Sequence, residues 1–572
     1  MSRKILAGLS DFRKIMEANG LYVDKSDFIS ELMDSGSEVV AIARPRRFGK
    51  SLNMSMLSYF FNIENREENR KLFKGLKIEK SPYFAEQGQY PVINMTFKNV
   101  RESNWEECLE KIRSVVADEY TKHKYLMAKD YENGGLDKKD IEYFQTIIDE
   151  KSSIIKLKES LKKLSHYLNR YYGKRVVVLV DEYDTPIIEG ELEGYFKEAS
   201  NFMQGFLNDA LKENESLHRG IITGITRLQG AGIFSGLNSA DICTIFDAGY
   251  KDKFGFTEKE VKELLHEYKM ADEEERVREH YNGYNFRGEV IYNPYSVVKS
   301  VVKREFGNFW LGSSSNDLAK KKVKQLIEMG RDEVIRKMVE DLLQGKKVKI
   351  KVKEVLEIRE DMSHVEILNL LLYSGYLKYE SHDEKRNEKG KIEVSIPNLE
   401  IKEIYNQSIE EWMEKGYGAE EAVELKSFLE SVCKGVEGEI KKGLERYLER
   451  RSVMDGEKIM EMGYHNFIFG LLQGLDSRYL LESNRESGKG RYDIMLTPIN
   501  MKEGDKLEEG VVIEMKVGEE GNLAEKSREA LKQIEEKKYF KSLEGKGIKK
   551  ARLIGIAFSG KEAEVCLKEI SL

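Results

Sequence analysis

The stretch EVVAIARPRRFGKSL, residues 38–52, joins an apolar run to a basic turn and then to the start of an amphipathic segment. Residues 38–43 have the length and apolarity of a short buried strand, and residues 52–63, LNMSMLSYFFNI, repeat apolar side chains at helical spacing. The turn between them ends in Gly49-Lys50-Ser51, the closing residues of a phosphate-binding P-loop, GxxxxGK[ST]. Strand, turn and helix predict the first unit of an α/β fold.

Arg44 stands where a P-loop has its first glycine. Arginine poorly tolerates the positive φ that glycine allows, so we expect the entry to this loop to differ from the usual one. The guanidinium of Arg44, Arg46 or Arg47 could instead contact phosphates in a bidentate manner. The alternative is a basic rim in a turn that binds no nucleotide.

The rest of the first 250 residues predicts a parallel sheet with helices on both sides, because further strands alternate with helical segments. These strands are YPVINMTF at 90–97, RVVVLV at 175–180 and RGIITGIT at 219–226. The continuous apolar run at 175–180 is typical of a strand buried on both faces of such a sheet. Thr226-Arg227, at the end of the last of these strands, is a candidate γ-phosphate sensor, or else a solvent-facing strand end.

Asp181 and Glu182 follow the buried strand directly and fit the acidic half of a nucleotide site. Asp181, with the Ser51 hydroxyl, would hold the Mg²⁺ shell, and Glu182 would polarise the attacking water. Lys50 would bridge the β- and γ-phosphates, while backbone N–H groups around Gly49 cradle them. The alternative is a capping aspartate beside a solvated glutamate.

Bulk composition limits the classes of function. The 572 residues predict two to four domains, and the net charge of -7 excludes a globally basic nucleic-acid binder. The four cysteines form no CxxC pair, so neither a zinc site nor a disulfide framework is indicated. No segment has 18 uncharged apolar residues, and we expect a soluble, cytoplasmic protein without a membrane partner.

Two changes in the sequence pattern, near residues 250 and 415, predict three domains. Residues 1–250 form the P-loop domain, residues 251–414 are mainly helical, and residues 415–572 form an α/β unit. In the last part, helices at roughly 419–473 precede strands at 490–498 and 510–518, a helix at 525–540 and a last strand at 551–559.

A second site is predicted in VVIEMKV, residues 511–517. Strand alternation places Glu514 and Lys516 together on one face of an otherwise apolar strand. Burying two charges there costs free energy, so a functional role would explain why they are present. Antiparallel pairing with the preceding strand would bring Asp493 beside Glu514. Two carboxylates and a lysine suit a hard divalent cation, Mg²⁺ or Mn²⁺, and a scissile phosphate. The alternative is a salt-bridged pair on an exposed edge strand.

Other residues are candidates to complete this site. Gln533, on the following helix, could point back at it, and Glu461 on an upstream helix could complete the metal shell. His465, four residues after Glu461, is interpreted as a packing or capping residue. A local basic cluster could bind along DNA, although a solvated face is the commoner explanation of such runs; it comprises Lys537, Lys538, Lys541, Lys546, Lys549, Lys550 and Arg552.

At these residues the chain resembles a bacterial family that has an N-terminal AAA-ATPase-like domain and a C-terminal PD-(D/E)XK nuclease-superfamily domain. The matching segments span nearly the whole chain: LYVDKSDFI (21–29), ARPRRFGKSLNMSML (43–57), VVVLVDEYDTPI (176–187), GITR (224–227), IFSGLN (233–238), HYNGYNF (280–286), IYNPYSV (291–297), LLYSGYL (371–377), SIPNLE (395–400), ESGKGRYDIML (486–496), VVIEMKV (511–517) and ALKQIEEKKY (530–539).

The resemblance implies roles for residues in both domains. Arginine at the first glycine position of the loop is the family's usual form. Asp493, Glu514 and Lys516 are implied as the nuclease triad, with Gln533 as an accessory residue. Lys50, Ser51, Asp181 and Glu182 are implied as the nucleotide site. Asp493 follows Arg491-Tyr492 rather than the proline of the strict superfamily pattern, which removes no metal ligand.

The function predicted from the sequence is a nucleotide-regulated nuclease that binds ATP and cuts nucleic acid, DNA rather than RNA, with a role in defence suggested by architecture alone. Two alternatives stay open. The chain is a nucleotide-dependent switch that binds nucleic acid or protein without cutting, or its P-loop domain is a scaffold that binds no ATP. A homo-oligomer is compatible with either.

Overall fold

The computed structural model divides the chain into two compact units, Met1–Tyr405 and Asn406–Leu572. It describes residues 3–128, 134–225, 240–310, 317–329, 333–343, 345–353, 356, 362–380, 390–405, 408, 419–449, 464, 468–469, 471–475, 478–483, 486–488, 490–499, 509–519 and 521–572. The predicted three-domain division at residues 250 and 414 stays a prediction.

A five-stranded sheet with the order β2-β3-β4-β1-β5 forms the centre of the first unit. All its pairs are parallel, as predicted. Its strands are β1 (Val39–Ala43), β2 (Val92–Thr96), β3 (Val176–Asp181), β4 (Leu217–Gly224) and β5 (Ala240–Cys243). Every residue of β1 and β3 is buried, as expected for strands covered on both faces. Parallel pairing brings the carboxyl ends of all five strands to one edge.

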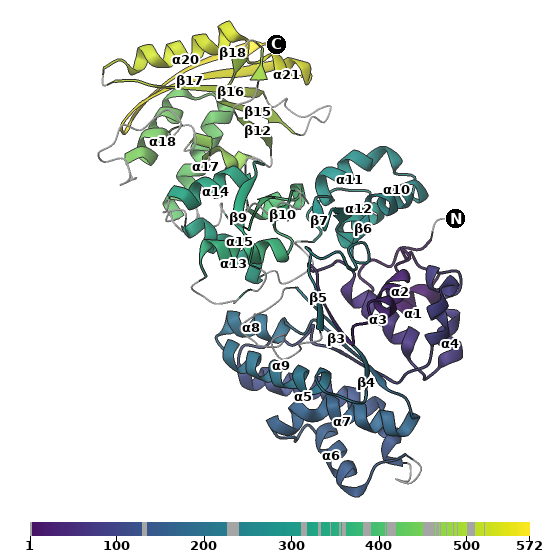
Figure 1. Ribbon diagram of the computed structural model, residues 1–572. Helices are drawn as coiled ribbons and strands as arrows, with labels where there is room; N and C mark the ends of the chain where they lie inside the picture. The colour runs from purple at the N-terminus through teal and green to yellow at the C-terminus, as the bar shows by residue number, and fades with distance from the viewer. Residues whose placement is uncertain are drawn as a thin grey trace. The chain divides into compact units, whose positions relative to one another are not determined.

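Helices cover both faces of this sheet. Figure 1 shows α5, α7 and α9 on one side and α1 to α3 on the other. The helices are α1 (Phe12–Glu17), α2 (Asp27–Asp34), α3 (Lys50–Phe61), α4 (Arg66–Lys71), α5 (Trp105–Lys122), α6 (Lys138–Ile148), α7 (Ile154–Tyr172), α8 (Thr185–Glu193) and α9 (Phe196–Leu211). Short 3₁₀ turns lie at η1 (Lys77–Lys80), η2 (Pro82–Glu86) and η3 (Lys124–Ala128).

The remainder of the first unit is mainly helical, as predicted, and it also holds two small antiparallel sheets, β6-β8-β7 and β10-β11-β9. Their strands have two to five residues, too few for alternation to predict. The elements are β6 (Phe256–Thr257), α10 (Glu258–Glu267), η5 (Ala271–Glu273), α11 (Glu274–Tyr281), β7 (Tyr284–Phe286), β8 (Glu289–Tyr292), α12 (Pro294–Lys303), α13 (Asp317–Glu328), α14 (Glu333–Leu343), β9 (Val348–Lys351), α15 (His364–Tyr373), β10 (Lys378–Tyr379) and β11 (Lys391–Ser395).

The second unit is built on a mixed sheet with the order β12-β15-β16-β17-β18. Only β16 and β17 pair in parallel, and α20 connects them. A Cβ at Gly555 in β17 would lie 2.2 Å from the Ser527 carbonyl oxygen of α20, so only glycine permits this close packing. The elements are α17 (Ala419–Lys434), α18 (Glu437–Glu449), η9 (Gln473–Leu475), β12 (Tyr479–Ser483), β13 (Glu486–Ser487), β14 (Gly490–Arg491), β15 (Ile494–Pro498), β16 (Gly510–Val517), α20 (Leu523–Lys537), α21 (Lys541–Gly545), β17 (Lys550–Ser559) and β18 (Glu562–Ser571).

The strands predicted at 490–498, 510–518 and 551–559 correspond to β14–β15, β16 and β17, but β17 is not the last strand. β18 follows it after a tight turn and pairs along its whole length. Its buried Ala563 and Val565 alternate with charged side chains, and most of its later residues are partly or fully exposed, as befits an edge strand. Among the described residues, no helix has the length and apolarity that crossing a bilayer would require.

Candidate nucleotide and nuclease sites

The P-loop joins β1 to α3, as predicted. Gly49 has φ +86°, in the left-handed region, and directly precedes the first residue of α3. Lys50 is 4% exposed, and its Nζ donates to the carbonyl oxygens of Arg44 at 3.0 Å and Pro45 at 2.9 Å. Burial lowers the pKa of Lys50, while the carboxylates of Glu182, Asp184 and Asp181 raise it. The lysine therefore lies in a field of acidic groups at the sheet edge.

Arg44 turns inward instead of toward a phosphate. Its side chain is fully buried, and it donates to the carbonyl oxygens of Ala43, Cys243, Gly249 and Tyr250 at 2.9 to 3.4 Å. Burial lowers its pKa to about 10, which still leaves it charged at neutral pH. The idea that Arg44 contacts phosphate is therefore wrong, because four backbone carbonyl oxygens already accept its hydrogen bonds.

The loop entry differs from the usual one, as expected. Positive φ occurs at Arg47, at +66°, and at Gly49, but not at Arg44. The Arg47 guanidinium lies 4.8 Å from the ring centroid of Tyr295 in α12, and the Phe48 ring packs edge-on against Tyr284 at 4.8 Å. Arginine at the first glycine position thus accompanies a loop fixed by contacts with the chain beyond residue 240.

The acidic half of the predicted site meets the P-loop. Asp181, at the end of β3, is 4% exposed and accepts hydrogen bonds from the Ser51 hydroxyl at 2.6 Å and the Thr223 hydroxyl at 2.5 Å. Burial and the neighbouring Glu182 raise the pKa of Asp181, whereas the two hydroxyls and Lys50 lower it. Mg²⁺ is commonly held near a P-loop by a hydroxyl oxygen and a carboxylate oxygen. Ser51 and Asp181 supply these two groups side by side, so they are suited to bind the Mg²⁺ of a nucleotide complex.

Glu182 has the left-handed φ of +51°, and its backbone N–H donates to the Thr223 hydroxyl at 3.3 Å. Asp184, which the sequence analysis missed, is 1% exposed and accepts from the backbone N–H of Ile225 at 2.6 Å. Its Oδ1 has no hydrogen-bond partner among the described residues. Burial raises its pKa to about 6. Its position as the second aspartate of the motif DEYD, residues 181–184, could have identified it from the sequence.

A cavity of about 230 Å³ opens at the loop. Its walls include the predicted residues Arg46, Arg47, Gly49, Lys50, Ser51 and Glu182, together with the N-terminal segment 5–10, Lys98, Arg101 and the start of α12. Arg46 and Arg47 therefore line the space beside the loop, and phosphate contact by either stays a prediction. Thr226 and Arg227 lie outside the described residues.

The nuclease-like residues meet through the pairing of β15 and β16. Ile494 pairs with Ile513, so the same register places Asp493 opposite Glu514. The backbone N–H of Asp493 donates to Glu514 Oε2 at 3.3 Å, and Asp493 Oδ2 accepts from the backbone N–H of Met515 at 2.7 Å. Glu514 is only 4% exposed. The two carboxylates therefore lie side by side.

Gln533 joins the glutamate to the lysine. Its Oε1 accepts from Lys516 Nζ at 2.8 Å, and its Nε2 donates to Glu514 Oε1 and, at 3.2 Å, to Tyr539 Oη. This amide orientation suits both partners, since the lysine can only donate and an ionised carboxylate can only accept. Tyr539 was not singled out from the sequence, although it ends the segment ALKQIEEKKY; burial raises its pKa.

The donor set at this site suits a hard divalent cation, because Asp493 and Glu514 offer carboxylate oxygens from neighbouring positions of the paired chain segments. Within the described part of the chain, no group of three or more His, Cys, Asp or Glu side chains has metal-binding geometry. Glu461, the predicted additional ligand, and His465 lie outside the described residues. The pair could be completed by water and by phosphate oxygens of a substrate.

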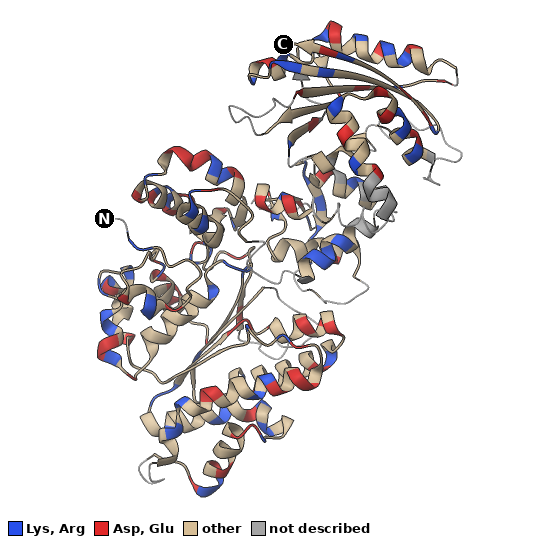
Figure 2. Cartoon of the chain, turned by 180° about the vertical axis from the view of Figure 1, so that it is seen from behind, with Lys and Arg blue, Asp and Glu red and all other residues tan. Residues whose placement is uncertain are grey.

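The predicted basic cluster is partly neutralised. Arg552 pairs with Glu509 at 2.7 Å and Glu569 at 2.9 Å, and Lys546 pairs with Glu482 at 2.8 Å. Figure 2 shows acidic and basic positions mixed along α20. Lys537, Lys538, Lys541 and Lys549 are exposed. Lys550 is exposed as well, 3.9 Å from Glu509, so a DNA track here would rest on these five lysines rather than on all seven cations.

Comparison with known families matches both regions. Residues 6–234 match the family described as "Predicted AAA-ATPase", and residues 459–568 match the "PD-(D/E)XK nuclease superfamily". A curated relative, "Uncharacterized protein in vnfD 5'region" of Azotobacter chroococcum mcd 1, is 29% identical over 319 residues, 54% of this chain. The match spans about half of that relative's length, 54%. Residues 6–234 are therefore similar to an AAA-ATPase-like domain, and residues 459–568 to a PD-(D/E)XK nuclease-superfamily domain.

Proposed function

We propose that this protein is a metal-dependent nuclease whose cleavage of nucleic acid is regulated by ATP bound at the P-loop. The observation that carries the proposal is the linked set of Asp493, Glu514, Lys516 and Gln533, in which one amide joins the lysine to the buried glutamate. An ion-paired surface strand needs no such bridge, whereas a phosphodiester site needs carboxylates and a cation held at fixed positions.

The chemistry of this site divides among its side chains. Asp493 and Glu514 would hold Mg²⁺ or Mn²⁺, and the chemistry that such an ion supplies is charge stabilisation at the phosphate and acidification of water. Lys516 Nζ would orient the attacking water or offset charge on the phosphate. Gln533 would hold Lys516 and Glu514 in register, and Tyr539 would fix Gln533. The lysine needs this support because its flexible stem otherwise loses its geometry.

The P-loop half would bind ATP through Lys50 and Ser51, with Asp181 in the Mg²⁺ shell and Glu182 facing the terminal phosphate. Regulation is proposed because one chain carries both sites. The proposed substrate is DNA, and the proposed location is the cytoplasm. The proposed biological role is defence against foreign DNA. Four free cysteines agree with a reducing compartment.

A cleavage assay tests the proposal. Purified full-length protein is incubated with single- and double-stranded DNA and RNA, with Mg²⁺, Mn²⁺ or EDTA. We expect divalent-cation-dependent cutting that Asp493→Asn and Glu514→Gln abolish, and that Glu536→Gln, an exposed carboxylate on α20, leaves intact. Equal cutting by wild type and Asp493→Asn would falsify the site. Binding without cutting by the wild type would support a nucleotide-dependent switch instead.

A further inference from the structure

Helix α7 carries an excess of positive charge in a chain whose net charge is -7. Its sequence, IIKLKESLKKLSHYLNRYY, has five lysine and arginine side chains and a single acidic one, Glu159. Its apolar face packs toward α9 and β3 and is buried, through Leu157, Leu161, Leu164 and Leu168. At about 3.6 residues per turn, one exposed side of the helix is shared by Lys156, Glu159, Lys162, Lys163 and His166.

The lysines on this side of α7 are not neutralised by their neighbours. Among the residues that the structure describes, no carboxylate oxygen lies within 4.0 Å of the amines of Lys156, Lys162 or Lys163. Exposed helices commonly pair such charges one turn apart, as Lys262 does with Glu258 on α10 at 3.6 Å. The exposed side of α7 therefore presents uncompensated positive charge.

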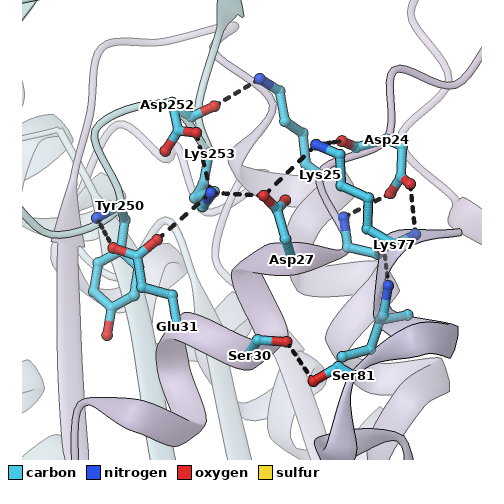
Figure 3. A network of polar contacts seen from close by, with 12 residues as sticks. Asp24, Lys25, Asp27, Ser30, Glu31, Lys77, Ser81, Tyr250, Asp252 and Lys253 are labelled. Atoms are coloured by element: carbon cyan, nitrogen blue, oxygen red, sulfur yellow. Dashed lines mark hydrogen bonds and ion pairs between the residues drawn. The ribbon is translucent and has the colours of Figure 1, made fainter.

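A second group of lysines in the first unit is neutralised within the fold. Lys253 pairs with Asp27 at 2.8 Å and Asp252 at 3.0 Å, and Lys77 lies 3.6 Å from Asp27. Figure 3 shows Lys253 among the carboxylates of Asp27, Glu31 and Asp252. These charges fasten α2 to the chain before residue 255, so they serve the fold rather than an outside partner.

An aromatic side chain on α6 is held between two of the α7 lysines. The hydroxyl of Tyr143 donates to the Lys156 carbonyl oxygen at 2.6 Å. The Lys156 and Lys163 amines lie 6.0 and 5.9 Å from the centroid of its partly exposed ring. Cation–π attraction at these distances keeps the two amines near the ring, so less conformational entropy is lost when they bind an anion.

A row of lysines on a straight helix suits an extended polyanion rather than a membrane. A helix that lies on a membrane buries its apolar face in lipid, whereas the apolar face of α7 is buried in the protein. Its exposed apolar side chains are Ile154 and Ile155, both in the first turn. The 19 residues of α7 span about 28 Å, comparable with about eight base pairs of duplex DNA.

We propose that the exposed side of α7, with Lys156, Lys162 and Lys163, binds the phosphate backbone of duplex DNA without sequence preference. The proposal goes beyond the proposed cleavage, because it needs neither a metal ion nor any residue of the nuclease-like site. Each phosphate that a lysine neutralises releases a counterion, so binding gains free energy from lysines that have no carboxylate partner. Contacts to phosphates position a duplex but carry no sequence information.

Fluorescence anisotropy of a short labelled duplex tests this surface. The full-length protein carries Asp493→Asn and is titrated in EDTA, so binding is measured whether or not the wild type cuts DNA. Changing Lys156, Lys162 and Lys163 together to alanine should weaken binding about 10²-fold at about 0.1 M salt and reduce the slope of log K against log salt by about 2 to 3. The loss should be equal for duplexes of unrelated sequence.

The matched control changes three exposed lysines in and after α10, Lys259, Lys262 and Lys269, to alanine. It alters the net charge by the same amount, and it should leave affinity within about twofold because charges far from the contact are screened. Glu159→Lys tests the opposite direction on α7. It should tighten DNA binding about tenfold and steepen the salt dependence by about 1.

Wild-type affinity in the triple α7 variant, or an equal loss in the α10 control, overturns the surface. Tighter binding to duplex RNA or to anionic phospholipid vesicles than to DNA also overturns it. A protein that binds DNA through α7 but cuts nothing in Mg²⁺ or Mn²⁺ would instead overturn the proposed cleavage and leave this surface intact.

Discussion

The nuclease-like site and the P-loop site differ in the sequence distance over which their contacts form. Asp493, Glu514, Lys516 and Gln533 contact one another across separations of 17 to 21 residues. Arg44 of the P-loop instead bonds to carbonyl oxygens 199 to 206 residues away. A site formed by one strand pair and the following helix can be predicted from the local sequence pattern. A loop whose position depends on residues about 200 positions away cannot. The predictions below test each half of this contrast.

The largest expected effect is on cleavage. Lys516→Met keeps the apolar stem but removes the charge, and we expect a fall in the cleavage rate of about 10²- to 10³-fold, as for the loss of one positioned donor at a charged transition state. Initial rates of Mg²⁺-dependent DNA cleavage measure it, with Lys532→Met on the exposed face of α20 as the control. Unchanged cleavage in Lys516→Met would mean that the lysine only supports Gln533.

Arg44→Lys tests the structural role of the unusual loop. One ammonium cannot reach all four carbonyl oxygens that the guanidinium satisfies, and each buried group left unpaired is costly. We expect a loss of about 3 kcal/mol in the local unfolding free energy, read as faster amide hydrogen exchange in β1 and β5. Arg66→Lys, on the exposed α4, should leave this exchange unchanged. Wild-type protection in Arg44→Lys would contradict the structural role of the Arg44 guanidinium in holding the loop.

Lys50→Ala addresses nucleotide binding. Removing a charge-assisted phosphate contact should weaken Mg²⁺–ATP binding by up to about 10²-fold. Calorimetry measures this change, and basal cleavage in the absence of ATP should not move. Identical ATP affinity in wild type and Lys50→Ala would favour the alternative in which the P-loop domain is only a scaffold.

The sequence separation between contacting residues explains how much of each site could be predicted. Alternation in VVIEMKV was enough to pair Glu514 with Lys516, and register through Ile494 and Ile513 then brought Asp493 to them. Tyr539 was not predicted as a site residue, because its contact with Gln533 depends on the path of the chain after α20 and not on a periodic pattern. Four strands of the parallel sheet could be predicted because each holds an apolar run and they alternate with helices. The fifth, β5, is short and carries the exposed Asp241, and it was not predicted.

Near the P-loop, sequence pattern was insufficient. Nothing local indicates that Arg44 is buried against backbone carbonyl oxygens after β5, since arginine is rarely fully buried. Arg101 is likewise brought to the cavity by strand order, which the sequence does not show. Asp184 was overlooked beside the more obvious pair before it, although burial raises its pKa against the hydrogen bond from Ile225, which lowers it.

The smallest expected effect concerns Asp184. Burial raises the pKa of its carboxyl to about 6, so between about pH 4 and 6 the folded state holds a proton that the unfolded state releases. The free energy of unfolding is therefore higher at low pH, where the buried carboxyl is protonated, and it falls as the pH rises through the pKa of the folded state. Asp184→Asn stays neutral and keeps an acceptor for Ile225, and it should stabilise the first unit by about 2 kcal/mol at pH 8.

Urea unfolding at pH 4.5 and pH 8, followed by hydrogen exchange of β3 and β4, measures this difference. The gain from Asp184→Asn should be clear at pH 8 and small at pH 4.5. Asp209→Asn in α9, outside the cavity lining, is the matched control. An equal effect of Asp184→Asn at both pH values would show that the carboxyl is ionised throughout this range.

One measurement tests the central claim most directly: the initial rate of Mg²⁺-dependent DNA cleavage by wild type, Asp493→Asn and Lys50→Ala, each with and without ATP. The account predicts that wild type cuts at a rate that ATP changes. It predicts that Asp493→Asn does not cut under either condition, and that Lys50→Ala cuts at a rate that ATP leaves unchanged. Cleavage by Asp493→Asn at the wild-type rate would contradict the nuclease site, and an unaltered ATP response in Lys50→Ala would contradict control through the P-loop.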